Sequence, residues 1–322
     1  MIKFLNSFSR FLRKFIAYIF ILAPMLVCAQ TQQTQSTDNS CPPPAMPREQ
    51  QRAYIANTPA LNAGFLWHIE KDGRTSWLYG TMHINHIDYV KPGSQIMSGL
   101  RNSDVLAVET NPLEIKNANV SLTVPDFKLT HVQLERLKNA YSTECLAFNP
   151  DKMPPSRVFI PLKNSQAQRE GLFFVYSHDL ILAGIAKKIG KPIIELENLQ
   201  QKLSVSKPTS QSEFDIDFDK TMRQIETGEM RAGILRLSMA WRKNDWQIMV
   251  KLEQDLTDSQ PDFAHRLLDQ RNELMAQKID ALHIEGKKVF VAVGALHMAG
   301  KNSLINLLQN KGYIVTFVPM RN

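Results

Sequence analysis

A short pattern near residue 80 constrains the fold of this 322-residue chain more than any other feature. Two strand-like runs, 65–70 and 75–79, flank an Asp-Gly turn and predict a hairpin whose second strand continues into Gly80-Thr81-Met82-His83. A helix is predicted over 94–101 and a buried strand over 104–109. The segment is therefore a strand, a Gly-x-x-His loop, a helix and a second strand.

A second copy of this unit lies near the C-terminus. The β-branched and aromatic run 288–293 enters Gly294-Ala295-Leu296-His297, and an amphipathic helix over 302–310 leads to a strand over 313–318. The two units predict an α/β fold with a mixed sheet, in which both Gly-x-x-His loops follow the carboxyl ends of strands. In open α/β sheets, ligand sites form at that edge.

The chemistry of the two loops centres on His83 and His297. Glycine lets the backbone turn sharply after a strand and approach a ligand. The imidazole three residues later can bind a metal or a proton. One Gly-x-x-His is a weak signal, because a loop histidine is more often a surface or capping residue, but two copies in matching contexts favour a shared site.

Carboxylates complete the predicted site. Glu109 ends the strand after the first loop, and Glu195 and Glu197 end another short strand, where alternation places them on one face. Two histidines and a carboxylate are suitable ligands for manganese, cobalt or zinc and leave positions for water. A remaining glutamate could act as a general base, or it could only cap a helix.

Several other site types are excluded because their motifs are missing. The chain has no His-Glu-x-x-His, no Gly-x-Ser-x-Gly and no Walker A loop. A long helix is predicted from Pro261 to about His283, and its Arg271 and Asn272 could anchor a carboxylate or orient the site. An ordinary exposed helix arginine is the alternative.

Helical segments separate the two units. A helix over 169–189 ends at Gly190 before the strand 193–197, and helical hairpins with charged outer faces fill 212–256. These hairpins belong to a predicted helical insert of about 199–260. The pattern leaves open whether the insert is a lid, a partner surface or a cover over the sheet.

The first 29 residues predict a cleavable secretory signal. Basic residues precede the apolar run 15–27, and Val27-Cys28-Ala29 offers a small-residue cleavage site after Ala29. The short apolar core disfavours a retained membrane anchor, and the bulky Val27 disfavours a lipoprotein signal at Cys28. The expected location is the periplasm or the cell exterior, with no membrane span in the mature chain.

Loss of that signal changes the meaning of the charge and of the cysteines. The net charge falls from +7 to +3, because the segment holds four basic and no acidic residues, and no nucleic-acid partner is expected. Residues 30–53, rich in Gln, Thr and Pro, predict a flexible tether before a globular part over 54–322. Cys41 and Cys145 then remain as a candidate disulfide, with two unpaired cysteines as the alternative.

Five separated motifs resemble the TraB/PrgY/GumN family, to which the animal TIKI proteases are related. They lie within about residues 60–320 and follow the family's order: Tyr79-Gly80-Thr81-Met82-His83, Val108-Glu109, Gly190-Lys191-Pro192 leading to Leu196-Glu197, Asp269-Gln270-Arg271-Asn272, and Val293-Gly294-Ala295-Leu296-His297-Met298-Ala299-Gly300. The resemblance implies an α/β fold of the erythromycin-esterase and ChaN-like (EreA/ChaN-like) group. It also implies divalent-metal-dependent proteolysis, the reaction of the TIKI relatives.

The resemblance also implies roles for individual residues. His83, His297 and Glu109 match positions that would hold the metal. The implied catalytic residues are Glu109, Glu197 and Arg271, and the implied substrate-binding residues are Asp179 and Asn272. Glu195 stands where the family varies, and Thr110 and Asn111 replace a further acidic residue found in many members.

The first functional hypothesis is an exported metal-dependent hydrolase of peptide-like substrates. In it, a second carboxylate handles the proton and Arg271 places the substrate or a developing oxyanion. The alternative is a non-catalytic module that binds a peptide or a small ligand in the same cleft. A third hypothesis is haem or iron capture through the histidines.

Overall fold

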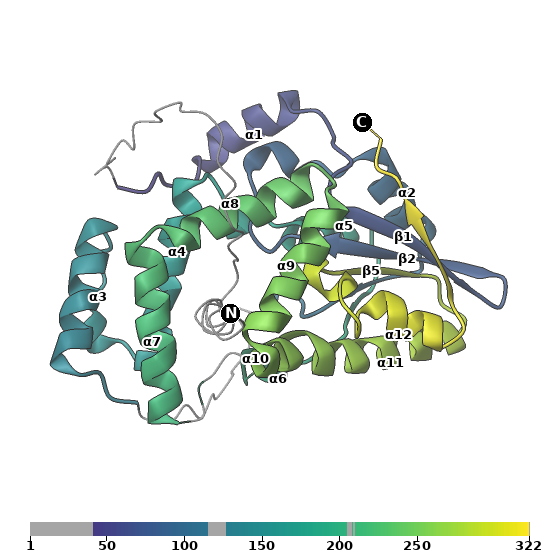
Figure 1. Cartoon of the computed structure of the whole chain (residues 1–322). Coiled ribbons are helices and arrows are strands. Elements are labelled where there is room, and N and C mark those ends of the chain that lie inside the picture. Colours follow the sequence, from purple (N-terminus) through teal and green to yellow (C-terminus); the bar gives the residue numbers. More distant parts are fainter. Residues whose placement is uncertain (1–40, 115–126, 205–207, 209, 322) are drawn as a thin grey trace, which may run out of the picture.

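The computed structural model describes residues 41–114, 127–204, 208 and 210–321. The predicted signal over 1–29 and the first part of the predicted tether lie outside the described residues. The described chain forms a six-stranded sheet with helices on both faces (Figure 1). This arrangement confirms the predicted α/β class with a mixed sheet, whereas membership of the EreA/ChaN-like group stays a prediction. In the part of the chain that is described, no helix has the length and apolar character needed to cross a membrane.

The central strands of the sheet are parallel. The strands are β1 (Phe65–Lys71), β2 (Arg74–Thr81), β3 (Val105–Val108), β4 (Ile193–Glu195), β5 (Val289–Gly294) and β6 (Ile314–Val318). Their order is β4-β3-β5-β2-β1-β6, and β1, which is antiparallel to both β2 and β6, runs opposite to the other strands of this sheet. Thr81 at the end of β2 pairs with Gly294 at the end of β5, so the two Gly-x-x-His loops leave the sheet side by side.

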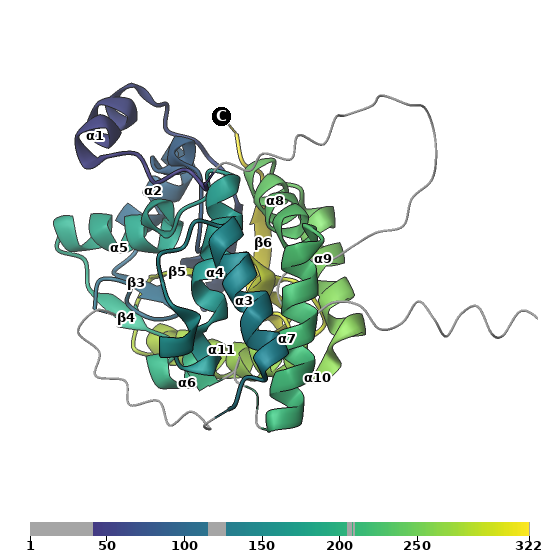
Figure 2. The ribbon, with the colours of Figure 1, turned by 90° about the vertical axis from the view of Figure 1, so that its left-hand side faces the viewer.

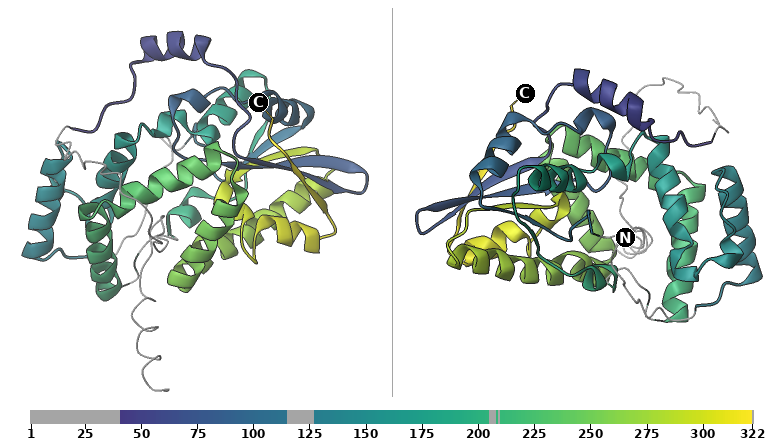
Figure 3. Two further views of the ribbon diagram at one scale, coloured as in Figure 1. Left: turned by 45° about the horizontal axis from the view of Figure 1, so that its top comes forward. Right: turned by 180° about the vertical axis from the view of Figure 1, so that it is seen from behind.

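Helices cover both faces of this sheet. The helices are α1 (Arg48–Asn57), α2 (Ser94–Asn102), α3 (His131–Thr143), α4 (Phe159–Arg169), α5 (His178–Lys188), α6 (Leu199–Ser204), α7 (Gln211–Glu226), α8 (Glu229–Arg242), α9 (Trp246–Ser259), α10 (Pro261–Ala264), α11 (Gln270–Ile284) and α12 (Leu304–Asn310). Helices α2 and α5 lie on one face, and α11 and α12 lie on the other (Figures 1 and 3). Both predicted strand, loop, helix and strand units are therefore present.

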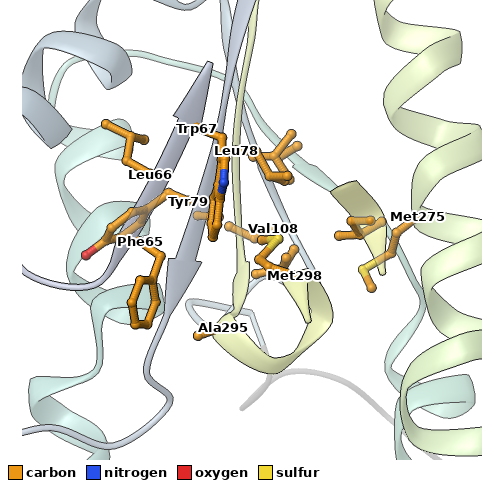
Figure 4. Packing of buried hydrophobic residues seen from close by; sticks show 14 of the residues in the cluster. Phe65, Leu66, Trp67, Leu78, Tyr79, Val108, Met275, Ala295 and Met298 are labelled. Atoms are coloured by element: carbon orange, nitrogen blue, oxygen red, sulfur yellow. The ribbon is translucent and has the colours of Figure 1, made fainter. Parts of the chain in front are cut away.

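The main hydrophobic core lies directly behind the ends of β2 and β5. Phe65, Tyr79 and Met298 belong to this core, and Figure 4 shows them close to the second loop. The core also ties down the end of β2, because the Tyr79 hydroxyl donates to the Ala63 carbonyl at 2.8 Å and the Trp241 indole donates to the Gly80 carbonyl at 2.8 Å. Burying one large apolar side chain contributes about 1.5–3 kcal/mol to the stability of the folded state. The buried side chains of this core therefore hold the strand ends from which the two loops begin.

Helices α3, α4 and α7 form a second body beyond the edge at which β2 ends (Figures 1 and 2). It has its own apolar cluster, made of Phe127, Leu137, Tyr141, Val158, Leu162, Phe214, Phe218 and Met222. The predicted helical hairpins over 212–256 are confirmed as α7, α8 and α9. Helix α7 packs against α3 and α4, so this part of the predicted insert does not lie flat over the sheet.

The predicted helix over 169–189 is wrong in its first half. Gly171 adopts a φ of 68°, and the Leu172 amide bonds to the Ala167 carbonyl, so α4 ends at Arg169. Helix α5 begins only at His178, where the Ser177 hydroxyl accepts the Leu180 amide at 3.2 Å. A glycine in the left-handed region outweighs the apolar stripe that suggested one continuous helix.

The predicted disulfide between Cys41 and Cys145 is present. Its Cα atoms are 5.5 Å apart and its cysteines are 104 residues apart in the sequence. It ties the segment before α1 to the residues that follow α3. Residues 48–53 of the predicted tether belong to α1, whose Tyr54 hydroxyl donates to Asp88 at 2.5 Å.

Candidate functional site

The carboxyl ends of β2, β3 and β5 bring three of the predicted site residues together. His83 Nε2 lies 3.4 Å from Oε1 of Glu109, and His297 Nε2 lies 3.7 Å from the same oxygen. Glu109 and His297 are buried, while the His83 side chain is 49% exposed. Two imidazoles from loops more than 200 residues apart therefore face one carboxylate oxygen.

The glycines of both motifs allow this close approach. A Cβ atom on Gly294 would lie 3.2 Å from Glu109 Oε1 and 3.2 Å from His83 Nε2. The Gly294 amide instead donates to Glu109 Oε1 at 2.7 Å. A Cβ atom on Gly80 would lie 3.1 Å from Ala295, in the other loop. A Cβ atom at either position would require its neighbours to shift by a few tenths of an ångström.

A second set of contacts orients the two imidazoles. His83 Nδ1 lies 3.0 Å from Asp179 Oδ2, and His297 Nδ1 lies 2.6 Å from Asn272 Oδ1. The Thr81 hydroxyl donates to the other Asp179 oxygen at 2.8 Å. An oxygen on each Nδ1 leaves each Nε2 to face Glu109, which is the arrangement expected around ligating histidines. The implied role of Asp179 and Asn272 in substrate binding stays a prediction.

Arg271 joins the two glutamates that the resemblance implies. Its guanidinium donates to Glu197 at 2.7 and 2.5 Å and to Glu109 Oε2 at 2.7 Å. A fourth bond, at 2.9 Å, runs to the carbonyl of Leu267 in the π-helical turn His265–Asp269, directly before α11. Arg271 is only 7% exposed. Both oxygens of Glu197 are therefore engaged by this guanidinium.

Lys202 is a site residue that the sequence patterns did not indicate. Its Nζ lies 2.5 Å from Glu109 Oε2 and 4.0 Å from Glu197 Oε1. It is carried by the short helix α6, which begins two residues after Glu197. No motif marks it, and only its spacing of five residues after Glu197 could have suggested it.

Glu195 and Glu197 do not share one face, contrary to the prediction. Strand β4 ends at Glu195, so the alternation of side chains does not continue to Glu197. Glu195 is exposed and accepts the Asn111 amide at 2.6 Å, whereas Glu197 is buried against Arg271. Of the two, only Glu197 reaches the histidine site.

Neighbouring charges and burial shift the pKa values of Glu109 and of both histidines. Burial would raise the pKa of Glu109, but Lys202 and His83 outweigh it and hold this pKa well below the usual range. Burial would likewise lower the pKa of His83, but Asp179 and Glu109 raise it. Burial, together with the Arg271 cation, lowers the pKa of His297 to about 3. Glu109 is therefore an anion and His297 is neutral near pH 7.

The donor atoms fit a metal site in part. Two imidazole nitrogens face the same carboxylate oxygen, and each imidazole is held from behind by an oxygen. Glu109, however, also accepts hydrogen bonds from Arg271, Lys202 and Gly294. Within the described residues, no group of three or more His, Cys, Asp or Glu side chains is arranged to hold a metal ion.

A cavity of about 830 Å³ opens beside the ends of β3 and β4. Its lining includes Asn111, Lys191, Glu195 and Leu199. Asn111 and Glu195 place it near the ends of β3 and β4, but Glu109 and Glu197 are not among its lining residues. A cavity of this size can hold several residues of a peptide or a small organic molecule.

Stability should depend on pH through His178, which lies beside the site. Its ring packs against Trp241 with 4.6 Å between ring centroids, and burial lowers its pKa to about 4 from 6.5. Above pH 6.5 the His178 imidazole is mostly neutral in both the folded and the unfolded chain. As the pH falls towards 4, this imidazole takes up a proton in the unfolded chain but not in the folded chain. Between pH 7 and pH 4 this group should therefore lower the free energy of unfolding of the wild type by about 3 kcal/mol.

Urea unfolding at both pH values measures this effect. His178→Gln should lose about 3 kcal/mol less than the wild type over the same range. The matched control is His131→Gln, because His131 is exposed at the start of α3. If His178→Gln and the wild type showed the same loss, the neutral buried imidazole would not account for the pH dependence.

Known proteins resemble this chain over most of its length. Uncharacterized protein YbaP from Shigella flexneri is 26% identical over 246 residues, which are 73% of this chain and 88% of that protein. YbaP from Escherichia coli K12 is 26% identical over 242 residues, or 72% and 87% of the two chains. Metalloprotease TIKI1 from Danio rerio is 25% identical over an aligned length of 328 residues, or 82% of this chain and 65% of that protein. No solved structure shows a significant match.

The family model for TraB/PrgY/gumN matches residues 65–316. This range contains both Gly-x-x-His loops, the strand ends with Glu109 and Glu197, and the Arg271-Asn272 pair. It also spans all six strands apart from the end of β6. The chain therefore belongs to the TraB/PrgY/gumN family.

Proposed function

We propose that this protein is an exported hydrolase of peptide-like substrates that depends on a divalent metal such as manganese, cobalt or zinc. The observation that carries the proposal is the convergence of His83 Nε2 and His297 Nε2 on Glu109 Oε1, at 3.4 and 3.7 Å. The relationship to TIKI1, named a metalloprotease, supports the reaction class. The cavity near the ends of β3 and β4, lined in part by Asn111 and Glu195, has room for a substrate of peptide size.

The chain's own residues would hold the ion as two imidazoles and one carboxylate. His83, His297 and Glu109 supply the donors, and Asp179 and Asn272 keep the imidazoles in place. When bound, a divalent cation activates water and polarises a carbonyl group. Arg271 positions Glu109 through its bond to Oε2, and Glu197 positions Arg271.

This arrangement changes what we expect of Glu197. The sequence suggests it as a carboxylate that accepts a proton, but both of its oxygens accept hydrogen bonds from Arg271. A bidentate pair with a guanidinium leaves neither oxygen of this carboxylate turned towards a substrate. We therefore assign Glu197 to holding Arg271, and its effect on the reaction would pass through that contact.

Export is the second part of the proposal. The basic and apolar segment over 1–29 has the order of a secretory signal, and its removal would leave Cys41 and Cys145 as the remaining cysteines. Their disulfide supports an oxidising compartment, because such bonds are rare in the reducing cytosol. The periplasm or the cell exterior is the proposed location.

Metal analysis of the mature protein, residues 30–322, tests the metal site. Protein stripped of metal would be offered manganese, cobalt or zinc and dialysed, and bound metal would be measured by mass spectrometry. We expect roughly one ion per chain in the wild type and none in His83→Ala or His297→Ala. His131→Ala, at an exposed histidine outside the site, is the control. A wild type that retains no more metal than the two variants, with all three metals, would refute the metallohydrolase.

A peptide library tests the reaction. Cleavage should occur with the wild type, stop on chelation and return when metal is added back. Cleavage that persists in His83→Ala would reject this mechanism. Metal binding without any cleavage would favour the binding module, and a Soret band on adding haem, lost in both histidine variants, would favour haem capture.

A further inference from the structure

Strand β4 is the last strand at one edge of the sheet. Among the described residues it pairs with β3 alone, in parallel register (Figure 2). The carbonyl of Pro192 and the amide of Leu196 bond to β3 at 2.9 and 2.8 Å. In a parallel ladder, Ile194, midway between them, turns its amide and carbonyl the same way. The amides and carbonyls of Ile193 and Glu195 therefore point away from β3.

These outward groups can pair with another strand. Of the contacts recorded in the described part of the chain, one involves them: the Glu195 carbonyl lies 3.4 Å from Nζ of Lys278. Unpaired amides and carbonyls at the edge of a sheet are a template for a further strand. Such edges bind extended peptides by adding them to the sheet.

The cavity of about 830 Å³ follows this edge. Ile193 and Glu195 both line it, Gly190 and Pro192 line it before the strand begins, and Leu199 lines it after the strand ends. The outward side of β4 therefore faces a space with room for several residues of a peptide.

The two ends of this cavity carry opposite charges. Lys187 and Lys191 line it where β4 begins, and Glu114 and Glu195 line it where β4 ends. Glu114 lies at that end because its amide bonds to the Asn111 carbonyl, while the Asn111 amide bonds to Glu195 at 2.6 Å. A peptide carries its own positive charge at the amino end and its negative charge at the carboxyl end. Its charges match both ends of the cavity only when it runs antiparallel to β4.

We propose that the free edge of β4 binds an extended peptide antiparallel to the strand. The amino end of the peptide lies towards Glu114 and Glu195, and its carboxyl end lies towards Lys187 and Lys191. Backbone hydrogen bonds supply affinity for many sequences, and the charged ends set the direction. The inference rests on the proposed function for its substrate class and adds how that substrate is held. Binding at the edge itself needs no metal.

Calorimetric titration of the mature protein, residues 30–322, with two peptides tests the direction. The first is Lys-Lys-Val-Thr-Val-Thr-Glu-Glu, and the second has the charged ends exchanged, Glu-Glu-Val-Thr-Val-Thr-Lys-Lys. A chelator in the buffer separates binding from any metal-dependent cleavage. The first peptide should bind at least about fivefold more tightly, because each of its ends meets the opposite charge. Equal affinities, a preference for the second peptide, or no binding at about 1 mM would overturn the inference.

N-methylated forms of the first peptide test the strand pairing. Alternate amides of an added strand face its neighbour, so the two valine amides and the two threonine amides cannot both face β4. Methyl groups on one of these pairs should weaken binding at least about tenfold, and methyl groups on the other pair should change it less than about threefold. Equal losses for the two pairs would refute strand addition.

Two variants of the protein locate the site. Ile193→Pro removes an amide that faces the cavity and no bond to β3, so the first peptide should bind at least about tenfold more weakly. Ile193→Ala loses the same side chain but keeps the amide, and its affinity should stay within about threefold of the wild type. Equal affinities in the two variants would show that this amide does not bind the peptide.

The basic end of the cavity is tested at Lys187. Lys191 also donates to the Ser103 carbonyl, so exposed Lys187 is the better residue to change. Lys187→Glu should weaken binding of the first peptide at least about threefold. Lys243→Glu, at an exposed position directly after α8, is the control and should change it less than about twofold. Equal effects of the two changes would contradict the proposed direction.

Amide hydrogen exchange in the wild type gives the location without a variant. Saturating peptide should slow exchange at Ile193 and Glu195 at least about tenfold and leave β6, the other edge strand, unchanged. Protection in β6 but not in β4 would overturn the inference. This measurement decides the question even if Ile193→Pro does not fold.

The outcomes separate this inference from the proposed function. If peptides pair with β4 but no metal binds and no cleavage occurs, the peptide edge stands and the metallohydrolase falls. If the wild type cleaves peptides but neither amide exchange nor N-methylation shows pairing with β4, the hydrolase stands and the peptide edge is rejected.

Discussion

Replacing Arg271 with methionine is expected to lower the free energy of unfolding at pH 7 by about 3–5 kcal/mol. Methionine fills a similar volume but removes three hydrogen bonds to buried carboxylates. Among the described residues, the ion pair left to the buried Glu197 would then be the one with Lys202, at 4.0 Å. A buried charge that loses its partner costs several kcal/mol, which is much more than the pair itself contributes.

Urea unfolding followed by fluorescence measures this effect, and the chain offers a matched control. Arg136 also pairs with two carboxylates, Asp219 and Glu226, but these are exposed on α7. Arg136→Met should therefore cost about 1 kcal/mol or less. Adding Glu197→Gln to Arg271→Met should restore at least half of the loss. A loss below about 1 kcal/mol in Arg271→Met would show that the pair is solvated and does not hold the site together.

Replacing Glu109 with glutamine is expected to lower kcat/KM for peptide cleavage by about 10³-fold or more. Glutamine keeps the shape of the side chain, but its amide carries no negative charge. It also has one oxygen where Glu109 has two, so it cannot face the two histidines and also accept from Gly294, Arg271 and Lys202. The change therefore removes both the proposed ligand and the acceptor that unites the site.

The comparison for this prediction is Glu285→Gln, directly after α11 and before β5 begins. Glu285 is exposed and pairs with Lys287, so its loss should leave kcat/KM within about twofold of the wild type. Near-ultraviolet circular dichroism would check that both variants fold. Cleavage by Glu109→Gln within tenfold of the wild type would remove Glu109 from the reaction.

The sequence was most informative where the chemistry repeats locally. Two runs of strand residues followed by Gly-x-x-His predict the same local geometry twice, because strand propensity and the glycine turn act over a few residues. The pairing of β2 with β5 then brings the two loops together. The sequence also predicts the disulfide between Cys41 and Cys145, because Cys28 is the one other cysteine in the sequence.

The sequence was least informative where side chains meet across elements. Alternation along a strand predicts Glu195 and Glu197 on one face, and only the resemblance favours Glu197. Strand β4 ends at Glu195, however, and the end of a short strand depends on its neighbours. The apolar stripe over 169–189 looked like one helix, but the left-handed conformation of Gly171 divides it. The resemblance matches Asp179 only to an acidic position in the family's central helix, whereas the structure places its carboxylate against His83 Nδ1.

The sequence by itself determined the α/β class, the two histidine loops and the identity of the buried strands, because each depends on local periodicity and turn chemistry. Only the tertiary structure decided that Glu109 stands between both histidines, that Arg271 unites Glu109 and Glu197, and that Lys202 lies on Glu109. Ion pairs form between residues that are distant in the chain, and their partners follow from sheet order and helix packing. No spacing rule along one chain encodes such contacts.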